Sequence, residues 1–316
     1  MISVAVATYN GEKFIEKQLN SIREQNLSVD EVVICDDCST DKTYEICENF
    51  IEKNSLKNWR LYKNETNVGY CLNFYGAIEK CLGDIIFLAD QDDEWYPEKT
   101  EKMMACMGEN PHISVLSSRY DVIDGESNII ENSGVTYLGE RYDDSIEYIS
   151  AESQIGCSYI RGFSICFRKS LKPLIKPIDL KSLLSHDWLI CMLGALTGKT
   201  AILNTILTSY RYHGDNVTLM SSDKKKSERK LEKRIRGVEE SVNGHNYLIT
   251  LSEDEILNKQ IEKFIKFEEK RLKFLNTKNI FTYLSLFFEM GEYNRYYKGN
   301  GARVWLGDFV YAYKKQ

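Results

Sequence analysis

Residues 84–93 run Asp84-Ile85-Ile86-Phe87-Leu88-Ala89-Asp90-Gln91-Asp92-Asp93, an apolar segment followed at once by carboxylates. A run that is apolar at every position from 85 to 89 is typical of a strand covered on both faces, as in a parallel sheet. Three carboxylates after such a strand repel one another unless a cation or a ligand offsets them. The stretch therefore predicts an α/β sheet with a site at the end of this strand.

The sequence before and after this stretch alternates between apolar runs and helical spacing. Further strands are expected at 2–8, 31–35 and 59–62, and helices at 14–22, 44–50, 71–82 and after Pro97. This alternation predicts parallel strands joined by right-handed crossovers. The strands end in Thr8-Tyr9-Asn10 and Asp36-Asp37. Ligands bind at that edge of open α/β sheets, so a site is expected there.

The two acidic segments suit a nucleotide and a metal. A hard divalent ion such as Mg²⁺ or Mn²⁺ takes one or two carboxylates and leaves positions for phosphate oxygens. A carboxylate in Asp36-Asp37 would accept hydrogen bonds from a nucleobase imide or a ribose hydroxyl. The alternative for the later carboxylates is that one of them caps the helix after Pro97.

Several other classes of protein are disfavoured by the sequence. The 41 Lys and Arg residues against 47 Asp and Glu give a net charge of −6, whereas a nucleic-acid-binding domain is expected to be basic. No GxGxxG follows the first strand, and the near P-loop at 194–200 precedes a strand instead of following one. A phospho-receiver would need an Asp after the third strand, and residues 59–64 lack it. The CxxC at 35–38 has no second pair to complete a zinc site.

The composition and the first residues of the chain indicate where in the cell the protein is expected. Hydrophobic residues make up 43% of the chain, enough for a sizeable core. No apolar run of about 18 residues predicts a transmembrane helix, and no basic-then-apolar leader predicts a signal peptide. The nine scattered cysteines are typical of reduced thiols. We therefore expect a cytoplasmic protein.

The ordered motifs of the chain resemble those of the family-2 glycosyltransferases. They are Thr8-Tyr9-Asn10-Gly11, residues 35–41, Asn67-Val68-Gly69, Gly83-Asp84 and residues 90–93. Members of that family are inverting enzymes with a GT-A fold that use nucleotide-sugar donors, and the resemblance covers about residues 2–217. The Gln inside the acidic motif, followed by Glu94-Trp95-Tyr96-Pro97, is similar to the rhamnosyltransferase-like branch that builds bacterial surface polysaccharides.

The resemblance implies roles on the donor side. Binding of the donor nucleotide would fall to Thr8, Tyr9, Asn10, Asp36, Asp37 and Asn67. Asp90 would approach the ribose or the sugar, and Asp92 would hold Mg²⁺ or Mn²⁺. His213 would complete the metal shell or touch the diphosphate, or else would only bond within its loop. Arg211 would support it and is expected among the donor-binding residues. Asp93 would support Asp92 or cap a helix.

The resemblance also implies roles on the acceptor side. His186-Asp187-Trp188 lies where the family carries its acid–base motif, so Asp187 is expected to be the general base, with His186 and Trp188 beside the acceptor. The alternatives are that Asp187 caps a helix or that His186 is the base. Gly162 lies near the acceptor pocket, where Phe163 replaces the family's small polar residues.

The last third of the chain has a different composition. Residues 223–236 hold eight Lys or Arg and three Asp or Glu, and residues 281–313 hold 11 aromatics. We expect a helical hairpin at 223–277, begun at its second helix by a capping box of Ser252 and Glu255, with the aromatic tail packed on it. The domains are therefore predicted at 1–220 (GT-A, a mixed, mainly parallel sheet between helices) and 221–316 (helical). The basic run is either a solvated face or a contact with the membrane.

The sequence predicts transfer of a sugar, with inversion, from dTDP-rhamnose or a UDP-hexose to a hydroxyl of a saccharide or lipid-linked saccharide. Peripheral contact with the inner membrane face and homo-oligomerisation are compatible with it. One alternative is a sugar-nucleotide pyrophosphorylase, which would carry a Gly-rich, Arg-containing segment after the first strand. The other is a non-catalytic membrane-associated adaptor, which would not need the carboxylates.

Overall fold

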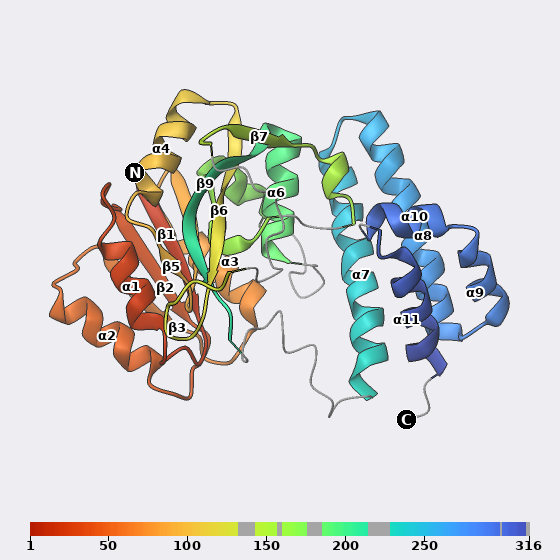
Figure 1. The fold of residues 1–316 in the computed structure, drawn as a ribbon, viewed down its shortest axis with the longest axis horizontal. Coiled ribbons are helices and arrows are strands. Elements are labelled where there is room, and N and C mark those ends of the chain that lie inside the picture. The colour runs from red at the N-terminus through yellow and green to blue at the C-terminus, as the bar shows by residue number, and fades with distance from the viewer. Residues whose placement is uncertain (132–142, 157–159, 176–184, 214–227, 298, 314–316) are drawn as a thin grey trace. The chain divides into compact units, whose positions relative to one another are not determined.

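A computed structural model of the chain describes residues 1–131, 143–156, 160–175, 185–213, 228–297 and 299–313 (Figure 1). The chain forms two compact units. The first, here the sheet unit, comprises Met1–Ser150, Tyr159–Pro177 and Ile190–Asn216. The second, here the helical unit, comprises Ala151–Ser158, Ile178–Leu189 and Val217–Gln316. The boundary expected at residues 220 and 221 lies outside the described residues.

The first half of the sheet unit follows the predicted alternation of strands and helices. Its elements are β1 (Ile2–Thr8), α1 (Ile15–Arg23), β2 (Glu31–Asp36), α2 (Thr43–Lys53), β3 (Trp59–Lys63), α3 (Tyr70–Lys80), β4 (Ile85–Asp90), β5 (Glu94–Trp95) and α4 (Lys99–Glu109). The second half, as far as it is described, has fewer helices and contains two long strands, of 11 and 13 residues. Its elements are β6 (Ile113–Ile123), β7 (Ile146–Ile149), β8 (Ile165–Arg168), α5 (Lys172–Ile175) and β9 (Lys199–Arg211), together with α6 (His186–Thr197), whose first four residues are assigned to the helical unit.

The strands of the described residues form one mixed sheet in the order β3-β2-β1-β4-β8-β6-β9-β5, with β7 paired to β9. The pairs β1–β2, β1–β4, β2–β3 and β6–β9 are parallel. The pairs of β8 with β4 and β6, and of β9 with β5 and β7, are antiparallel. The mixed, mainly parallel sheet between helices is thus confirmed.

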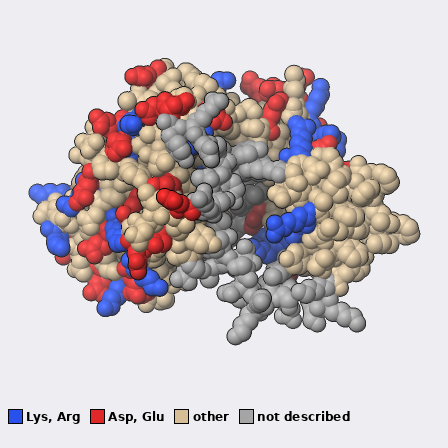
Figure 2. Space-filling model, viewed as in Figure 1, with Lys and Arg blue, Asp and Glu red and all other residues tan. Residues whose placement is uncertain are grey.

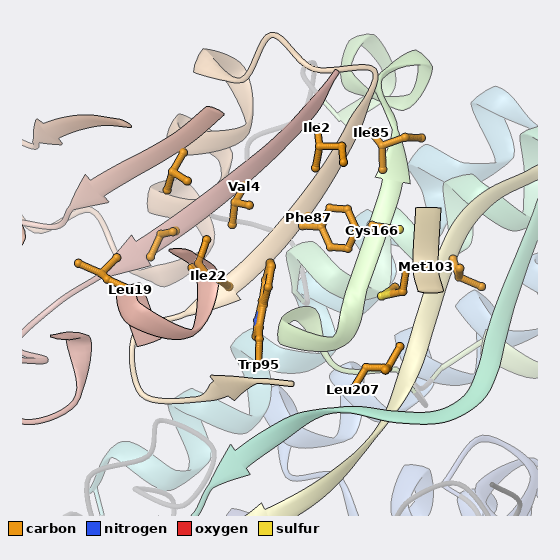
Figure 3. Close-up of a cluster of buried hydrophobic side chains, with 14 of the residues drawn as sticks. Ile2, Val4, Leu19, Ile22, Ile85, Phe87, Trp95, Met103, Cys166 and Leu207 are labelled. Carbon is orange, nitrogen blue, oxygen red and sulfur yellow. The ribbon is translucent and has the colours of Figure 1, made fainter. Parts of the chain in front are cut away.

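The core of the sheet unit lies between the sheet and the helices α1, α2 and α4, with Trp95 of β5 packed into it. Every residue of β1 and β2 is buried, as expected for strands covered on both faces. Figure 3 shows Leu19 and Ile22 of α1 on the same side of the sheet as Val4 and Phe87, with Trp95 of β5 beside them. The rings of Phe87 and Trp95 lie 5.7 Å apart, so β5 is anchored directly after the acidic residues.

The helical unit contains α7 (Glu228–Leu251), α8 (Glu255–Thr277), α9 (Ile280–Phe287), α10 (Met290–Tyr296) and α11 (Gly301–Tyr313). The hairpin of α7 and α8 is confirmed from residue 228 onward, because residues 223–227 lie outside the described range. Tyr296 of α10 packs edge-on against Phe264 of α8 at 4.5 Å, and Tyr293 packs in the same way against Phe267 at 4.7 Å. This part of the aromatic tail therefore forms core, as expected. No helix among the described residues is both long and apolar enough to span a bilayer.

The predicted capping box of Ser252 and Glu255 is wrong. Asp254 is the N-cap of α8, and its Oδ1 accepts hydrogen bonds from the amides of Ile256 and Leu257. Ile256, in the first turn of α8, is 69% exposed. An Asp directly before the helix satisfies two amides by itself, so the more distant Ser is not needed.

Candidate active site

Strand register brings the predicted donor residues to one edge of the sheet. Thr8 pairs with Asp36 across β1 and β2, and Ala7 pairs with Asp90 across β1 and β4. All three strands are parallel, so their carboxyl ends coincide. The structure therefore places Thr8, Asp36 and Asp90 side by side, as the sequence predicted.

Asp36 holds the loop that follows β2. Its carboxylate accepts hydrogen bonds from Thr8 Oγ1 at 3.1 Å, from the amide of Ser39 at 2.9 Å and from Ser39 Oγ. Ser39 Oγ in turn accepts from the amide of Asn10, whose own Oδ1 accepts from the amide of Thr40. The loops after β1 and β2 are thus tied together. Asp36 has a positioning role in this arrangement.

Asp37 is buried and almost fully bonded. Asn64 Nδ2 and the amide of Val68 donate to Oδ1, and the amide of Gly69 donates to Oδ2, each at 2.8 Å. Asn67 Nδ2 donates to the Asp37 carbonyl at 3.3 Å. An ionised carboxylate offers about four acceptor sites, so about one remains on Asp37. That number suits a single N–H of a nucleobase.

Gln91 joins the acidic loop to the end of β1. Its Oε1 accepts from the amide of Tyr9 at 2.7 Å, and its Nε2 donates to the carbonyl of Tyr9 at 3.0 Å. A Cβ on Gly11 would lie 2.3 Å from Gln91 Oε1, so residue 11 must be glycine for Gln91 to reach Tyr9. The Tyr9 side chain is 45% exposed and available to a ligand.

Asp92 and His213 meet from segments 121 residues apart. Asp92 Oδ2 and His213 Nε2 lie 2.9 Å apart, and both side chains are mostly buried. The His213 ring packs on Phe14, at the start of α1, at 4.9 Å. The sequence predicted these two residues as metal ligands, and the structure brings them together.

Arg211 lies beneath this pair and is fully buried. Its Nε donates to the Asp92 carbonyl at 2.7 Å, one terminal nitrogen donates to the Asp124 carbonyl at 2.6 Å, and the other pairs with Glu94. Its guanidinium lies over the Phe14 ring at 4.9 Å. These bonds hold the backbone at Asp92 in place. Arg211 thus positions Asp92, whereas the sequence predicted that it contacts the donor directly.

Asp93 is buried beside like charges. Its Oδ1 accepts from the amide of Arg211 at 2.9 Å, whereas Oδ2 has no hydrogen-bond partner among the described residues. Burial, and then the charges of Asp92 and Asp90, raise the pKa of Asp93 well above its usual value. A cation at this edge would offset that repulsion.

A buried lysine in the first turn of α4 contacts the segment around Gly162. Lys99 Nζ donates to the carbonyl of Phe163 at 2.8 Å and to Thr208 Oγ1 at 2.7 Å, and it lies 4.3 Å from the centre of the Trp95 ring. Burial lowers the pKa of Lys99 to about 7. Gly162 and Phe163 are themselves buried, so Lys99 fixes the backbone at the expected acceptor segment.

Asp187 begins α6 in the helical unit. Its Oδ1 accepts from the amide of Trp188 at 2.7 Å. Trp188 is buried, donates from its indole to the Gln154 carbonyl at 3.0 Å, and packs on the His245 ring at 4.7 Å. Burial lowers the pKa of His186 below its usual value, which keeps its imidazole neutral. Trp188 is therefore part of the helical core, and Asp187 lies at the first turn of its helix.

The residues at the sheet edge fit a divalent cation that is shared with a ligand. Two neighbouring ligands of an octahedral Mg²⁺, each about 2.1 Å from the ion, lie about 3 Å apart. The oxygen of Asp92 and the nitrogen of His213 have that spacing. No group of three or more His, Cys, Asp or Glu side chains suited to a metal occurs in the described parts of the chain. A cation here would thus need further oxygens from a diphosphate and water.

Two of these residues were not singled out from the sequence. Gln91 carried a signal, since an amide stands among three carboxylates, but its bonds to Tyr9 span 82 residues. Lys99 carried none, because a lysine near a helix start is ordinarily solvated.

Comparison with known proteins identifies a family and relatives of this chain. Residues 3–174 match the model of glycosyl transferase family 2. An uncharacterized glycosyltransferase of Nostoc is 25% identical over 216 residues, which is 68% of this chain and 66% of the relative. The dTDP-rhamnosyl transferase RfbG of Shigella flexneri is 28% identical over 67% of this chain and 72% of its own length. The poly(ribitol-phosphate) beta-N-acetylglucosaminyltransferase TarS of Staphylococcus aureus is 35% identical over 39% of this chain and 21% of its own length.

Solved structures share the fold. TarS 1–349 of S. aureus in complex with UDP-GlcNAc superposes with a TM-score of 0.60 at 22% identity, over 98% of this chain and 81% of that one. The mannosyltransferase PcManGT of Pyrobaculum calidifontis, in complex with GDP-Man and Mn²⁺, superposes with a TM-score of 0.58 at 16% identity, over 98% and 84%. The expected GT-A fold with C-terminal helices is thereby confirmed. From the match over residues 3–174, the chain belongs to glycosyl transferase family 2.

Proposed function

We propose that this protein transfers a sugar from a nucleotide diphosphate donor to an acceptor hydroxyl, with inversion, in the synthesis of a cell-surface polysaccharide. The observation that carries the proposal is the meeting of two polar groups at one sheet edge. Thr8, Asp36 and Asp37 lie at the ends of β1 and β2, and the Asp92–His213 pair follows β4 and β9. A nucleotide diphosphate needs hydrogen-bonding groups for its nucleobase and ribose, and metal ligands for its diphosphate, at neighbouring positions. Membership of the family supports the same reaction.

Residues at the ends of β1 and β2 bind the nucleotide part of the donor. The remaining acceptor site of Asp37 takes an N–H of the base, and the exposed Tyr9 side chain lies against the base or ribose. Asn10 and Asn67 keep the surrounding loops in place through their bonds to residues 40 and 37. Asp90 lies toward the ribose or the sugar.

Asp92 and His213 would hold Mg²⁺ or Mn²⁺. The ion would neutralise charge on the departing diphosphate. Arg211 keeps Asp92 in place, and the charges of Asp92 and Asp90 that raise the pKa of Asp93 are the negative charges that a cation at this edge would offset. The Mn²⁺ named with the Pyrobaculum structure supports a divalent ion in this fold.

Asp187 is proposed as the general base. An acceptor hydroxyl has a pKa far above 7, so its attack on the anomeric carbon requires a positioned proton acceptor. The carboxylates of the sheet edge are committed to the donor and the metal. Asp187 occupies the position of the family's acid–base motif, and its carboxylate lies in the first turn of α6, where it accepts from the Trp188 amide. A single displacement then inverts the anomeric centre.

The donor is proposed to be dTDP-rhamnose or a UDP-hexose, and the acceptor a saccharide or lipid-linked saccharide. The names of RfbG and TarS support these two donor classes. A lipid-linked acceptor places the protein in the cytoplasm, peripherally on the inner face of the membrane. A homo-oligomer is compatible with the proposal.

Ligand-induced stabilisation tests the proposed function. The melting temperature is measured with UDP-, dTDP-, GDP- and CMP-sugars, with and without Mn²⁺, because a ligand of the folded state raises stability. We expect dTDP- or UDP-sugars to raise it only when Mn²⁺ is present, and Asp92→Ala to abolish that rise. Asp84→Ala is the matched control, because Asp84 lies at the opposite end of the same strand and is exposed. Full transfer in excess chelator would contradict the metal assignment.

A further inference from the structure

The helical unit presents an apolar surface to solvent. It is formed by Phe281, Leu284, Phe287 and Phe288 at α9 and by Leu306 and Val310 of α11, here called the apolar face. Phe281 is 78% exposed and Phe288 is 88% exposed, and the other four are each 52–54% exposed. Large aromatic side chains with this exposure are unusual on a soluble surface and mark a contact site.

The apolar face is held rigidly from beneath. Tyr283 of α9 stacks on Trp305 of α11, with ring centres 4.5 Å apart, and also contacts Phe309 at 4.8 Å. Phe287 contacts the same Trp305 at 5.6 Å. Asn279 caps α9 by accepting from the amides of Phe281 and Thr282. The two helices therefore form one platform, and their outward side chains are fixed in that direction.

Exposed charges in the two segments that carry the apolar face have one sign, and Glu289, which follows Phe288, is paired with Lys270. Residues 277–288 contain a single charged residue, Lys278, and residues 301–316 contain Arg303, Lys314, Lys315 and Asp308. Asp308 is buried and bonded to Arg271 and Arg234. In the described part of these two segments, the exposed charged residues are thus the cations Lys278 and Arg303. Figure 2 shows the surface over α9 and α11 almost free of charged side chains.

We propose that the apolar face inserts into the interface of an anionic lipid bilayer. Phenylalanine and leucine side chains enter the boundary between headgroups and acyl chains, while nearby cations pair with anionic headgroups. A second copy of the chain fits this surface less well, because a two-fold interface over the apolar face would bring the Lys278 and Arg303 of both copies together, and the described part of these two segments has no exposed anion to pair with them. The inference rests on the proposed lipid-linked acceptor and names the surface that would bring the enzyme to it.

Vesicle flotation of the full chain tests the inference. One set of vesicles contains phosphatidylcholine alone. The other contains phosphatidylcholine and phosphatidylglycerol in a 7:3 ratio, so about one third of its lipids are anionic. We expect binding to the mixed vesicles, and a drop of at least about tenfold for Phe281→Asp with Phe288→Asp. Ile256→Asp is the matched control. Ile256 is 69% exposed on the same unit but begins α8, a helix about 34 Å long that ends just before α9.

A second pair of variants tests the charge argument. Lys278→Glu with Arg303→Glu keeps the apolar side chains and is expected to remove the preference for phosphatidylglycerol. Circular dichroism establishes that each variant is folded. Equal flotation of the wild type and the Phe double variant would overturn the inference. So would a wild-type dimer, seen by light scattering, that the Phe double variant dissociates.

Donor binding separates this inference from the proposed function. Melting shifts with nucleotide sugars and Mn²⁺ are measured on the same preparations. If the donor binds but vesicles do not, the surface assignment fails and the proposed function stands. If vesicles bind but no nucleotide sugar does, the proposed function fails, and the apolar face remains a lipid-binding surface.

Discussion

The two units bury carboxylates in opposite surroundings. In the helical unit, Asp308 bonds to Arg271 at 2.9 Å, to Arg234 and to the hydroxyl of Tyr293 at 3.1 Å. In the sheet unit, Asp93 has one bonded oxygen and one without a hydrogen-bond partner among the described residues. The charges of its neighbours Asp92 and Asp90 act against it more strongly than the charge of Lys99 acts in its favour.

The pKa values of the two groups move in opposite directions. Burial alone would raise the pKa of Asp308, but the charges and hydrogen bonds of Arg271 and Arg234 lower it below its usual value. Burial raises the pKa of Asp93, and the like charges of Asp92 and Asp90 add to that effect. A buried carboxylate paired with arginine stabilises a fold. A buried carboxylate among carboxylates marks a place where a cation is expected to bind.

The largest effect is expected from a third carboxylate, Asp187, which belongs to the helical unit while the donor residues belong to the sheet unit. Asp187→Asn keeps the shape and the bond to the Trp188 amide but cannot accept a proton. We expect transfer to fall by roughly 10²–10⁴ and donor affinity to stay within a few-fold, because only proton transfer is removed. Steady-state kinetics and calorimetric donor titration measure the two quantities. Near-normal turnover, together with an inactive His186→Ala, would assign the base to His186.

The next effect concerns the paired carboxylate. Asp308→Asn leaves the buried guanidinium of Arg271 with one acidic partner, Glu268, in place of two. Breaking a buried ion pair costs about 3–5 kcal/mol, so we expect the free energy of unfolding to fall by that amount. Urea unfolding followed by circular dichroism measures it. Asp254→Asn is the control, since Asn caps a helix as well as Asp does. A loss no larger than that of the control would show that the ion-pair cluster is dispensable.

The helical unit also contains a buried neutral histidine. His245 Nδ1 lies 2.7 Å from the Ser241 carbonyl, and Nε2 accepts from the amide of Gly156 at 3.2 Å, so the hydrogen sits on Nδ1. Burial lowers the pKa of His245 to about 4. Between pH 6.5 and 4 the unfolded chain binds more protons, so stability should fall with pH over this range, by up to about 3 kcal/mol.

Unfolding in urea at several pH values checks this expectation. His245→Gln should be less stable at pH 7 and should have a flatter dependence between pH 6.5 and 4. If the wild type and the variant lose stability in parallel as the pH falls, a group other than His245 is responsible.

Much of the sheet edge follows from local sequence. The apolar runs at residues 2–8, 31–36 and 85–90 determine parallel strands, and the polar residue at the end of each run must then lie at the shared edge. Thr8, Asp36 and Asp90 were therefore predictable as neighbours. The Asp92–His213 contact was expected only through the family resemblance, because 121 residues separate its partners.

Other features depend on tertiary placement that no local pattern specifies. Arg211 follows β9 as a cation near the site, but only the fold shows its guanidinium under the Asp92 carbonyl. The aromatic tail was expected to pack inside. Tyr293 and Tyr296 do so, whereas Phe281 and Phe288 face solvent. Composition gives the number of aromatics, and the relative positions of α8, α9 and α11 decide which of them are covered.

The smallest expected effect is also the sharpest test of the contrast between the two buried carboxylates. Asp93→Asn keeps Oδ1 as an acceptor for the Arg211 amide and places an NH₂ group where the carboxylate oxygen has no hydrogen-bond partner among the described residues. Removing a negative charge from beside Asp90 and Asp92 relieves repulsion. We therefore expect unfolding free energy to stay constant or rise by up to about 1 kcal/mol, the equivalent of about one pKa unit.

Asp93→Asn should also weaken the attraction of the sheet edge for a cation. The rise in melting temperature that donor and Mn²⁺ cause should therefore be smaller in this variant than in the wild type. In the control variant Asp84→Asn, whose substituted residue is exposed, the rise should equal that of the wild type. Urea unfolding without ligand and melting curves with Mn²⁺ and donor measure the two effects separately. A loss of stability as large as that of Asp308→Asn would mean that hydrogen bonds and cations of the protein balance the charge of Asp93 as fully as they balance that of Asp308. The sheet edge would then have no unmet charge for a cation to satisfy, and the metal would have to be attracted by Asp92 and His213 alone.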